Sequence, residues 1–197
     1  MKKFRALAVL MTLAAVCGAG EIRQLPAPRK SGDMSVQEAL NSRQSVRKFK
    51  AESLSDQQLS DILWCANGVN RPNGKRTAPS AMDRREVMIF AALPDGTYYY
   101  DAAAGVLVKK AGDLRKYCGK FAAPCYLILV PDRAKQNREI FAAVDTGYVS
   151  QNIYLAARSL GLGTCAMGSI IDRGMLKKEL DLGKNEPLLV HPVGIPE

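Results

Sequence analysis

The chain has only one histidine, and it lacks the motifs that mark several common classes of enzyme. The histidine, His191, lies between Val190 and Pro192. A Ser-His-Asp triad or a histidine-containing metal site would have to use it, so we expect neither. The five cysteines form no C-x-x-C pair, which disfavours a zinc site. Neither a strand followed by G-x-G-x-x-G nor G-x-x-x-x-G-K-S/T occurs, which argues against a Rossmann dinucleotide fold and a P-loop.

Acidic residues are fewer than basic ones, 19 against 28, so the formal net charge is +9. Lys2, Lys3 and Arg5 contribute three of these charges, and the remaining excess favours anionic ligands or surfaces. The cations are spread along the chain without a zinc-finger, KH or RRM signature, so we expect no nucleic-acid partner. A length of 197 residues and a hydrophobic content of 47% are typical of one globular domain.

Residues 1–20 have the pattern of a secretory signal peptide. The basic residues at the start precede the apolar run Ala6–Val16, and the small residues Cys17-Gly18-Ala19-Gly20 follow it. The run is too short for a stable membrane anchor. We expect an exported protein, either periplasmic after cleavage or a membrane-anchored lipoprotein with the lipid on Cys17. The alternative is that the run forms an apolar helix of the fold.

Two short signals predict where the domain and its first helices begin. Residues 21–34 contain Pro26 and Pro28 without an apolar period, so they are predicted to be a linker. A single domain would then cover residues 35–197. Ser35 and Ser55 are each followed three residues later by Glu or Gln, which is a capping box that predicts a helix start.

The remaining pattern predicts an α+β fold with a central, mainly antiparallel sheet flanked by helices. Apolar runs predict strands at residues 86–93, 97–101, 106–108, 125–130 and 188–193, the first three forming an antiparallel meander. The Ala-rich stretch 133–160 predicts the longest helix, buried in the core or at a subunit interface. Shorter helices are predicted at residues 113–120 and after Asp172. Strands and helices do not alternate strictly, which disfavours a doubly wound fold.

The stretch S-R-Q-S-V-R-K-F-K, residues 42–50, carries a candidate anion site. In an extended segment, side chains two residues apart point the same way, so Arg43, Ser45 and Arg47 would form one row. Arginine binds oxyanions with a planar fork and serine adds a donor, so the row suits a phosphate. The alternative is a solvated basic loop. The irregular stretch 70–83 is long for a loop inside a domain, which is typical of a functional or disordered segment.

Four stretches, in order and spacing, resemble the nitroreductase-like family of flavoenzymes. They are S-R-Q-S-V-R-K-F, A-P-S-A-M-D, Q-N-I-Y-L-A-A-R-S-L-G-L-G-T and P-V-G-I-P, and the resemblance covers residues 35–196. The stretch G-V-N-R-P with R-T-A-P-S-A, and the Tyr-rich meander, are similar to the branch that includes peptide thiazoline and oxazoline dehydrogenases. The resemblance implies a nitroreductase-like fold whose long helix lies at a homodimer interface.

The resemblance also implies FMN, bound without a covalent link at that interface. It further implies ping-pong hydride transfer from a reduced donor, NAD(P)H in the family, through FMN N5 to a nitroaromatic, a quinone or an unknown acceptor. No catalytic side chain is implied. The cofactor-binding residues implied by motif position are Arg43, Gln44, Ser45 and Arg47 at the phosphate and ribityl chain, Pro79, Ser80 and Asp83 beside the ring, and Gln151, Met167, Gly168 and Ser169 around the flavin pocket.

The chain departs from the family pattern at two places. Asp83 stands where the family usually has Asn, and Arg85 where it has Gln; an ionised Asp can only accept a hydrogen bond, whereas an amide can donate. The family usually continues beyond G-I-P with a basic residue that reaches the phosphate, so we expect Arg43 and Arg47 to carry more of that binding here. NAD(P)H is a cytoplasmic metabolite and FMN is made inside the cell, so an exported member would need another electron donor. The alternative function is therefore an exported, non-catalytic flavin-binding or envelope protein on the same fold.

Overall fold

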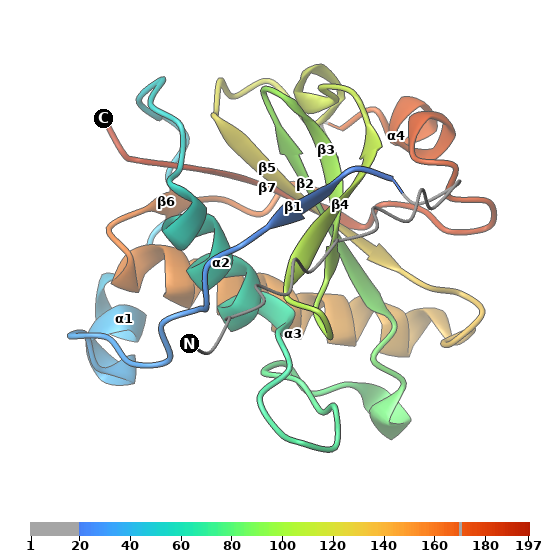
Figure 1. Ribbon diagram of the computed structural model, residues 1–197, viewed down its shortest axis with the longest axis horizontal. Helices are drawn as coiled ribbons and strands as arrows, with labels where there is room; N and C mark the ends of the chain where they lie inside the picture. The colour runs from blue at the N-terminus through green and yellow to red at the C-terminus, as the bar shows by residue number, and fades with distance from the viewer. Residues whose placement is uncertain (1–19, 170) are drawn as a thin grey trace, which may run out of the picture.

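The computed structural model describes residues 20–169 and 171–197, and its centre is an antiparallel β-sheet (Figure 1). The sheet has seven strands in the order β1-β4-β3-β2-β5-β7-β6, and every neighbouring pair is antiparallel. The strands are β1 (Ile22–Gln24), β2 (Val87–Leu93), β3 (Gly96–Asp101), β4 (Val106–Ala111), β5 (Cys125–Pro131), β6 (Gly163–Thr164) and β7 (Leu189–Gly194). The α+β class and the β2-β3-β4 meander are confirmed.

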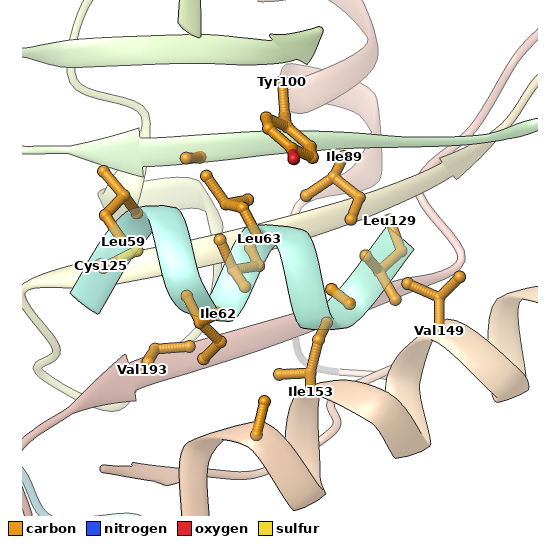
Figure 2. Packing of buried hydrophobic residues seen from close by; sticks show 14 of the residues in the cluster. Leu59, Ile62, Leu63, Ile89, Tyr100, Cys125, Leu129, Val149, Ile153 and Val193 are labelled. Carbon is orange, nitrogen blue, oxygen red and sulfur yellow. The ribbon is translucent and has the colours of Figure 1, made fainter. Parts of the chain in front are cut away.

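Both faces of the sheet are covered, which explains why its central strands are apolar almost throughout. Successive side chains on a strand point to opposite faces. On β2, Ile89 packs with α2 and α3, whereas Phe90 lies in the second cluster with Leu176 of α4. Figure 2 shows the first cluster, in which Leu63 of α2 points toward Ile89 and Tyr100 of the sheet. The sheet therefore supports two separate apolar layers.

The first two helices begin at the predicted capping boxes. α1 (Val36–Ser42) follows Ser35, whose hydroxyl accepts from the Glu38 amide at 3.2 Å. α2 (Asp56–Asn67) follows Ser55, whose hydroxyl accepts from the Gln58 amide at 3.2 Å. α2 ends at Gly68, where a Cβ atom would lie 2.4 Å from Trp64 Cδ1, so no other residue fits without rearrangement.

The long helix is shorter than the sequence predicts. α3 (Glu139–Ser159) has 21 residues and is about 31 Å long. The prediction was wrong for the six residues before it, because the amides of Lys135 and Gln136 donate to the Asp132 carbonyl and close a turn there. The predicted helix at residues 113–120 is only a 3₁₀ turn (Arg115–Tyr117), since Asp113 accepts from the Arg115 amide. α4 (Arg173–Glu179) starts at Asp172 as expected.

Residues 21–34, expected to be a linker, pack against the domain. Ile22–Gln24 add the edge strand β1 to β4. Arg29 donates to the buried Asp61 carboxylate from both its amide and its Nε, each at 2.7 Å. The sequence gives no sign of this because the partners lie more than thirty residues away. The predicted signal peptide falls on residues 1–19, outside the described part, and on Gly20. Among the described residues, no helix combines the length and hydropathy needed to cross a membrane.

Candidate functional site

The Arg43–Arg47 row is an extended segment held against β6. Arg43 has φ −60° and ψ 128°, so α1 ends there and the chain continues in extended form. The Val46 amide donates to the Thr164 carbonyl at 2.9 Å. A Cβ atom on Gly163 would lie 2.7 Å from Val46 Cβ, so a glycine is needed for this approach. Arg43 and Ser45 both contact Tyr154, as expected for residues two apart in an extended segment, and that Arg47 shares this side stays a prediction.

Tyr154 on α3 joins this row to the segment that follows β6. Its hydroxyl lies 3.1 Å from Ser45 Oγ and accepts from the Ala166 amide at 2.8 Å. The Arg43 guanidinium lies over the Tyr154 ring, 5.2 Å from its centre, in a cation–π arrangement. Sequence reasoning missed Tyr154, although its place one helical turn after Gln151 was a usable signal.

The two arginines of the row leave their charge available for an anion. Neither Arg43 nor Arg47 forms an ion pair with any residue within 20–169 or 171–197. Burial raises the pKa of the nearby Cys165 thiol, and the positive charge of Arg47 acts in the opposite direction. Two unpaired guanidinium groups with a hydroxyl between them form a donor set that favours a doubly charged oxyanion.

Met167, Gly168 and Ser169 come directly after Ala166, whose amide contacts Tyr154. Met167 is buried and exchanges two backbone hydrogen bonds of 2.9 Å with Val190, so its side chain belongs to the core. Gly168 is partly buried, and its carbonyl accepts from Arg173. Ser169 is exposed. Gln44 is exposed within the row itself. The structure therefore brings Arg43 and Ser45 to Tyr154, beside the Ala166 amide, while a shared site with Gln44, Arg47 and residues 167–169 stays a prediction.

The predicted ring-side residues Pro79, Ser80 and Asp83 lie elsewhere in the same chain. The loop that contains them is tied to the first half of α3, where Asp145 Oδ2 accepts from the Ala81 amide at 2.8 Å. Asp145 precedes Tyr154 by nine residues, or about 13 Å along the helix. Figure 1 shows this loop beside the start of α3, while α1 lies at its other end, where Arg158 donates to Ser42 at 2.8 Å. Within one chain, the predicted ring-side residues and the Arg43–Arg47 row therefore lie at different parts of α3.

The loop has an unusual backbone. Met82, Asp83 and Arg85 have φ angles of 57°, 54° and 51°, in the left-handed region that costs a non-glycine residue about 1 kcal/mol or more. The Arg85 amide donates to Ser80 Oγ at 2.8 Å, and the Arg85 side chain lies 3.5 Å from the Asp83 carboxylate. Asp83 and Arg85 are the two departures from the family pattern, and the fold pairs them with each other.

One face of α3 is apolar and exposed. Ile140, Val144 and Tyr148 are 69%, 44% and 46% exposed, and they follow each other at four-residue spacing. Gln151 continues this face three residues later and is also exposed. The opposite face, with Val149 and Ile153, is buried against the sheet (Figure 2). A contiguous exposed apolar face on a monomer is typical of an interaction surface.

The His191 side chain has a structural role inside the fold. Its ring is fully buried, with Nε2 2.9 Å from Ser150 Oγ and Nδ1 3.1 Å from Thr164 Oγ1. Burial lowers its pKa to about 3, so the ring is neutral and links α3 to β6 and β7. Within the part of the chain that the structure describes, no group of three or more histidine, cysteine, aspartate or glutamate side chains is placed to hold a metal ion.

Comparison with known proteins identifies the family of this chain. Residues 40–195 match the sequence model of the Nitroreductase family. A nitroreductase-family protein of Methanocaldococcus jannaschii is 30% identical over 183 residues, covering 82% of this chain and 91% of the relative.

Two solved structures show the same fold. One from Ralstonia eutropha JMP134 has 33% identity and a TM-score of 0.85, covering 100% of this chain and 99% of that one. One from Desulfovibrio desulfuricans, in complex with FMN, has 20% identity and a TM-score of 0.62, covering 83% and 87%. The sequence match spans most of the domain, from α1 to the end of β7. The chain therefore belongs to the nitroreductase family of oxidoreductases.

Proposed function

We propose that the protein is an FMN-dependent oxidoreductase of nitroreductase type that acts as a homodimer. Reducing equivalents would pass from a reduced donor, NAD(P)H in the family, to a nitroaromatic, a quinone or another small acceptor. When bound, FMN supplies the hydride chemistry at its N5 atom. The observation that carries the proposal is the Arg43-Ser45-Arg47 row, whose two arginines form no ion pair with any described residue and whose Arg43 and Ser45 contact Tyr154.

The residues around the row fit the FMN phosphate. Arg43 and Arg47 would donate from their guanidinium groups and Ser45 from its hydroxyl, since phosphate oxygens accept several charge-assisted hydrogen bonds. Tyr154 and the Ala166 amide would hold this set at a fixed distance from the segment 167–169. The positive charge at this end of α3 would also favour the reduced, anionic form of the flavin. A solved relative of the same fold is in complex with FMN, which agrees with this assignment.

A second copy of the chain would complete the site. Asp145, which contacts the ring-side loop, and Tyr154, which contacts the phosphate row, lie about 13 Å apart along α3, so we infer that the two halves of one flavin site come from different subunits. An antiparallel pairing of two α3 helices through Ile140, Val144 and Tyr148 would bring the start of one helix to the end of the other. Such a two-fold interface uses the same patch on both subunits, and covering this apolar face would remove it from water.

We further propose a branch of the nitroreductase family and a cellular location for the protein. The stretches G-V-N-R-P and R-T-A-P-S-A support a place near the peptide thiazoline and oxazoline dehydrogenases. The N-terminal pattern of residues 1–20 supports export, to the periplasm or as a lipoprotein anchored through Cys17. Export would remove the protein from cytoplasmic NAD(P)H, and this favours the second candidate, a flavin-binding envelope protein without that activity.

An absorption spectrum of the purified protein separates the candidates. The oxidoreductase should be yellow from bound FMN and should bleach when NADH or NADPH is added without oxygen. A yellow protein that neither nicotinamide reduces would favour the second candidate or a different donor. Protein that is colourless and takes up no added FMN would overturn both.

A further inference from the structure

Glu86 carries a carboxyl group that is buried inside the fold. It lies directly before β2, at the end of the loop that carries Asp83, and its side chain is fully buried. Neither carboxyl oxygen has a hydrogen-bond donor among the described residues. An ionised carboxylate in that state would be strongly destabilising, because it would lose its hydration without compensation.

The neighbours of Glu86 explain how this cost is avoided. Asp145 of α3, also buried, contacts the loop that leads into Glu86, because its Oδ2 accepts from the Ala81 amide, and it acts on the Glu86 carboxyl. Lys135, in the turn before α3, is the other charged group that acts on it. Burial, and then Asp145, raise the pKa of Glu86 to about 7, while Lys135 opposes them. Two adjacent carboxyl groups in a buried site favour a state in which only one is ionised.

We propose that Glu86 stays protonated and donates a hydrogen bond to the Asp145 carboxylate, and that this pair positions the loop from Ser80 to Arg85. The shared proton gives Glu86 the hydrogen bond that it otherwise lacks. It also leaves Asp145 Oδ2 free to accept from the Ala81 amide at 2.8 Å. Glu86 is thus a positioning residue that acts through Asp145 and does not itself touch the ligand.

The loop needs such a support because of its backbone. Three of its non-glycine residues are in the left-handed region. Among the described residues, the Asp145–Ala81 hydrogen bond ties its start to α3, whereas the Ser80–Arg85 and Arg85–Gly74 hydrogen bonds hold its end. Loss of the proton would place two negative charges side by side in a buried site. Their repulsion would weaken the Asp145–Ala81 contact and release the loop. That this loop faces the flavin ring rests on the proposed function; its support by the carboxyl pair does not.

Hydrogen exchange on the ligand-free, full-length protein tests the pair directly. Protection of the Ala81 amide, corrected for the intrinsic effect of pH, should fall at least tenfold between pH 6 and pH 8.5. Protection of the Gln58 amide, in the α2 capping box, and of the β5 amides should stay constant over this range. An unchanged Ala81 protection in the wild type would overturn the proposal, whether or not the protein binds FMN.

Variants of the pair sharpen the test. In Glu86→Gln, the neutral amide donates to Asp145 at every pH, so Ala81 should stay protected up to pH 8.5. In Asp145→Asn, the amide can donate to an ionised Glu86 and accept from Ala81, so the pH effect should again disappear. Glu52→Gln, at an exposed position, should keep the wild-type profile. A wild-type pH effect in Glu86→Gln would contradict the proposal, and if neither pair variant folds, the wild-type profile decides alone.

Discussion

Replacing both arginines of the row with alanine tests the phosphate site most directly. Each charge-assisted hydrogen bond to a phosphate contributes about 1.5–3 kcal/mol, so Arg43→Ala/Arg47→Ala should lose about 3–6 kcal/mol of FMN binding. At about 1.4 kcal/mol per factor of ten, the Kd for FMN should rise at least a hundredfold. The fold should survive, because Arg47 is exposed and Arg43 contributes only its contact over the Tyr154 ring.

The assay is titration of FMN by fluorescence, with thermal unfolding as the check on folding. Lys48→Ala/Lys50→Ala is a matched control, because it removes the same charge from two exposed neighbours of the row. It should change the Kd only slightly, since charges without direct contact are screened by salt. Arg43→Lys/Arg47→Lys should be intermediate, because lysine keeps the charge and loses the planar fork. Equal FMN affinity in the wild type and the double alanine variant would refute the assignment of the phosphate to this row.

Three other predictions use features elsewhere in the fold. Tyr154→Phe should weaken FMN binding about fivefold by removing one hydroxyl that contacts Ser45 and Ala166, measured by the same titration; an unchanged Kd would contradict this. Because folding raises the pKa of Glu86 to about 7, the unfolding free energy of the wild type should fall by about 3 kcal/mol as the pH rises from 4.5 to 7. Urea unfolding measures this change, and Glu86→Gln should lose much less. Under the proposed pairing through α3, the wild type should sediment as a dimer in analytical ultracentrifugation and Val144→Asp as a monomer, whereas Ile22→Asp, at an exposed apolar position on β1, should sediment like the wild type.

The contribution of protonated Glu86 to the unfolding free energy falls as the pH rises. The folded state holds the Glu86 proton more tightly than the unfolded state does, so its contribution is complete below the unfolded pKa and is lost as the pH rises to the folded value. A stability that rises over the same pH range in the wild type, relative to Glu86→Gln, would show that the group is ionised in the native protein.

Several features of the fold follow from local sequence alone. The capping boxes at Ser35 and Ser55 set the starts of α1 and α2, because each is closed by hydrogen bonds within four residues. The meander and the Arg43–Arg47 row depend only on the two-residue period of extended chain. The motif order was sufficient to predict the family, since it combines several such local patterns along one chain.

Only the tertiary structure decided the contacts between residues far apart in the sequence. Ser45 meets Tyr154 across 109 positions, and Ala81 meets Asp145 across 64. The pairing of β1 with β4 turned an expected linker into an edge strand. These contacts depend on how the helices and strands pack, which no periodicity encodes. The sequence by itself determined the candidate site and its cations, while packing determined that the loop with Ala81 and the row with Ser45 contact different parts of α3 and that Glu86 is buried.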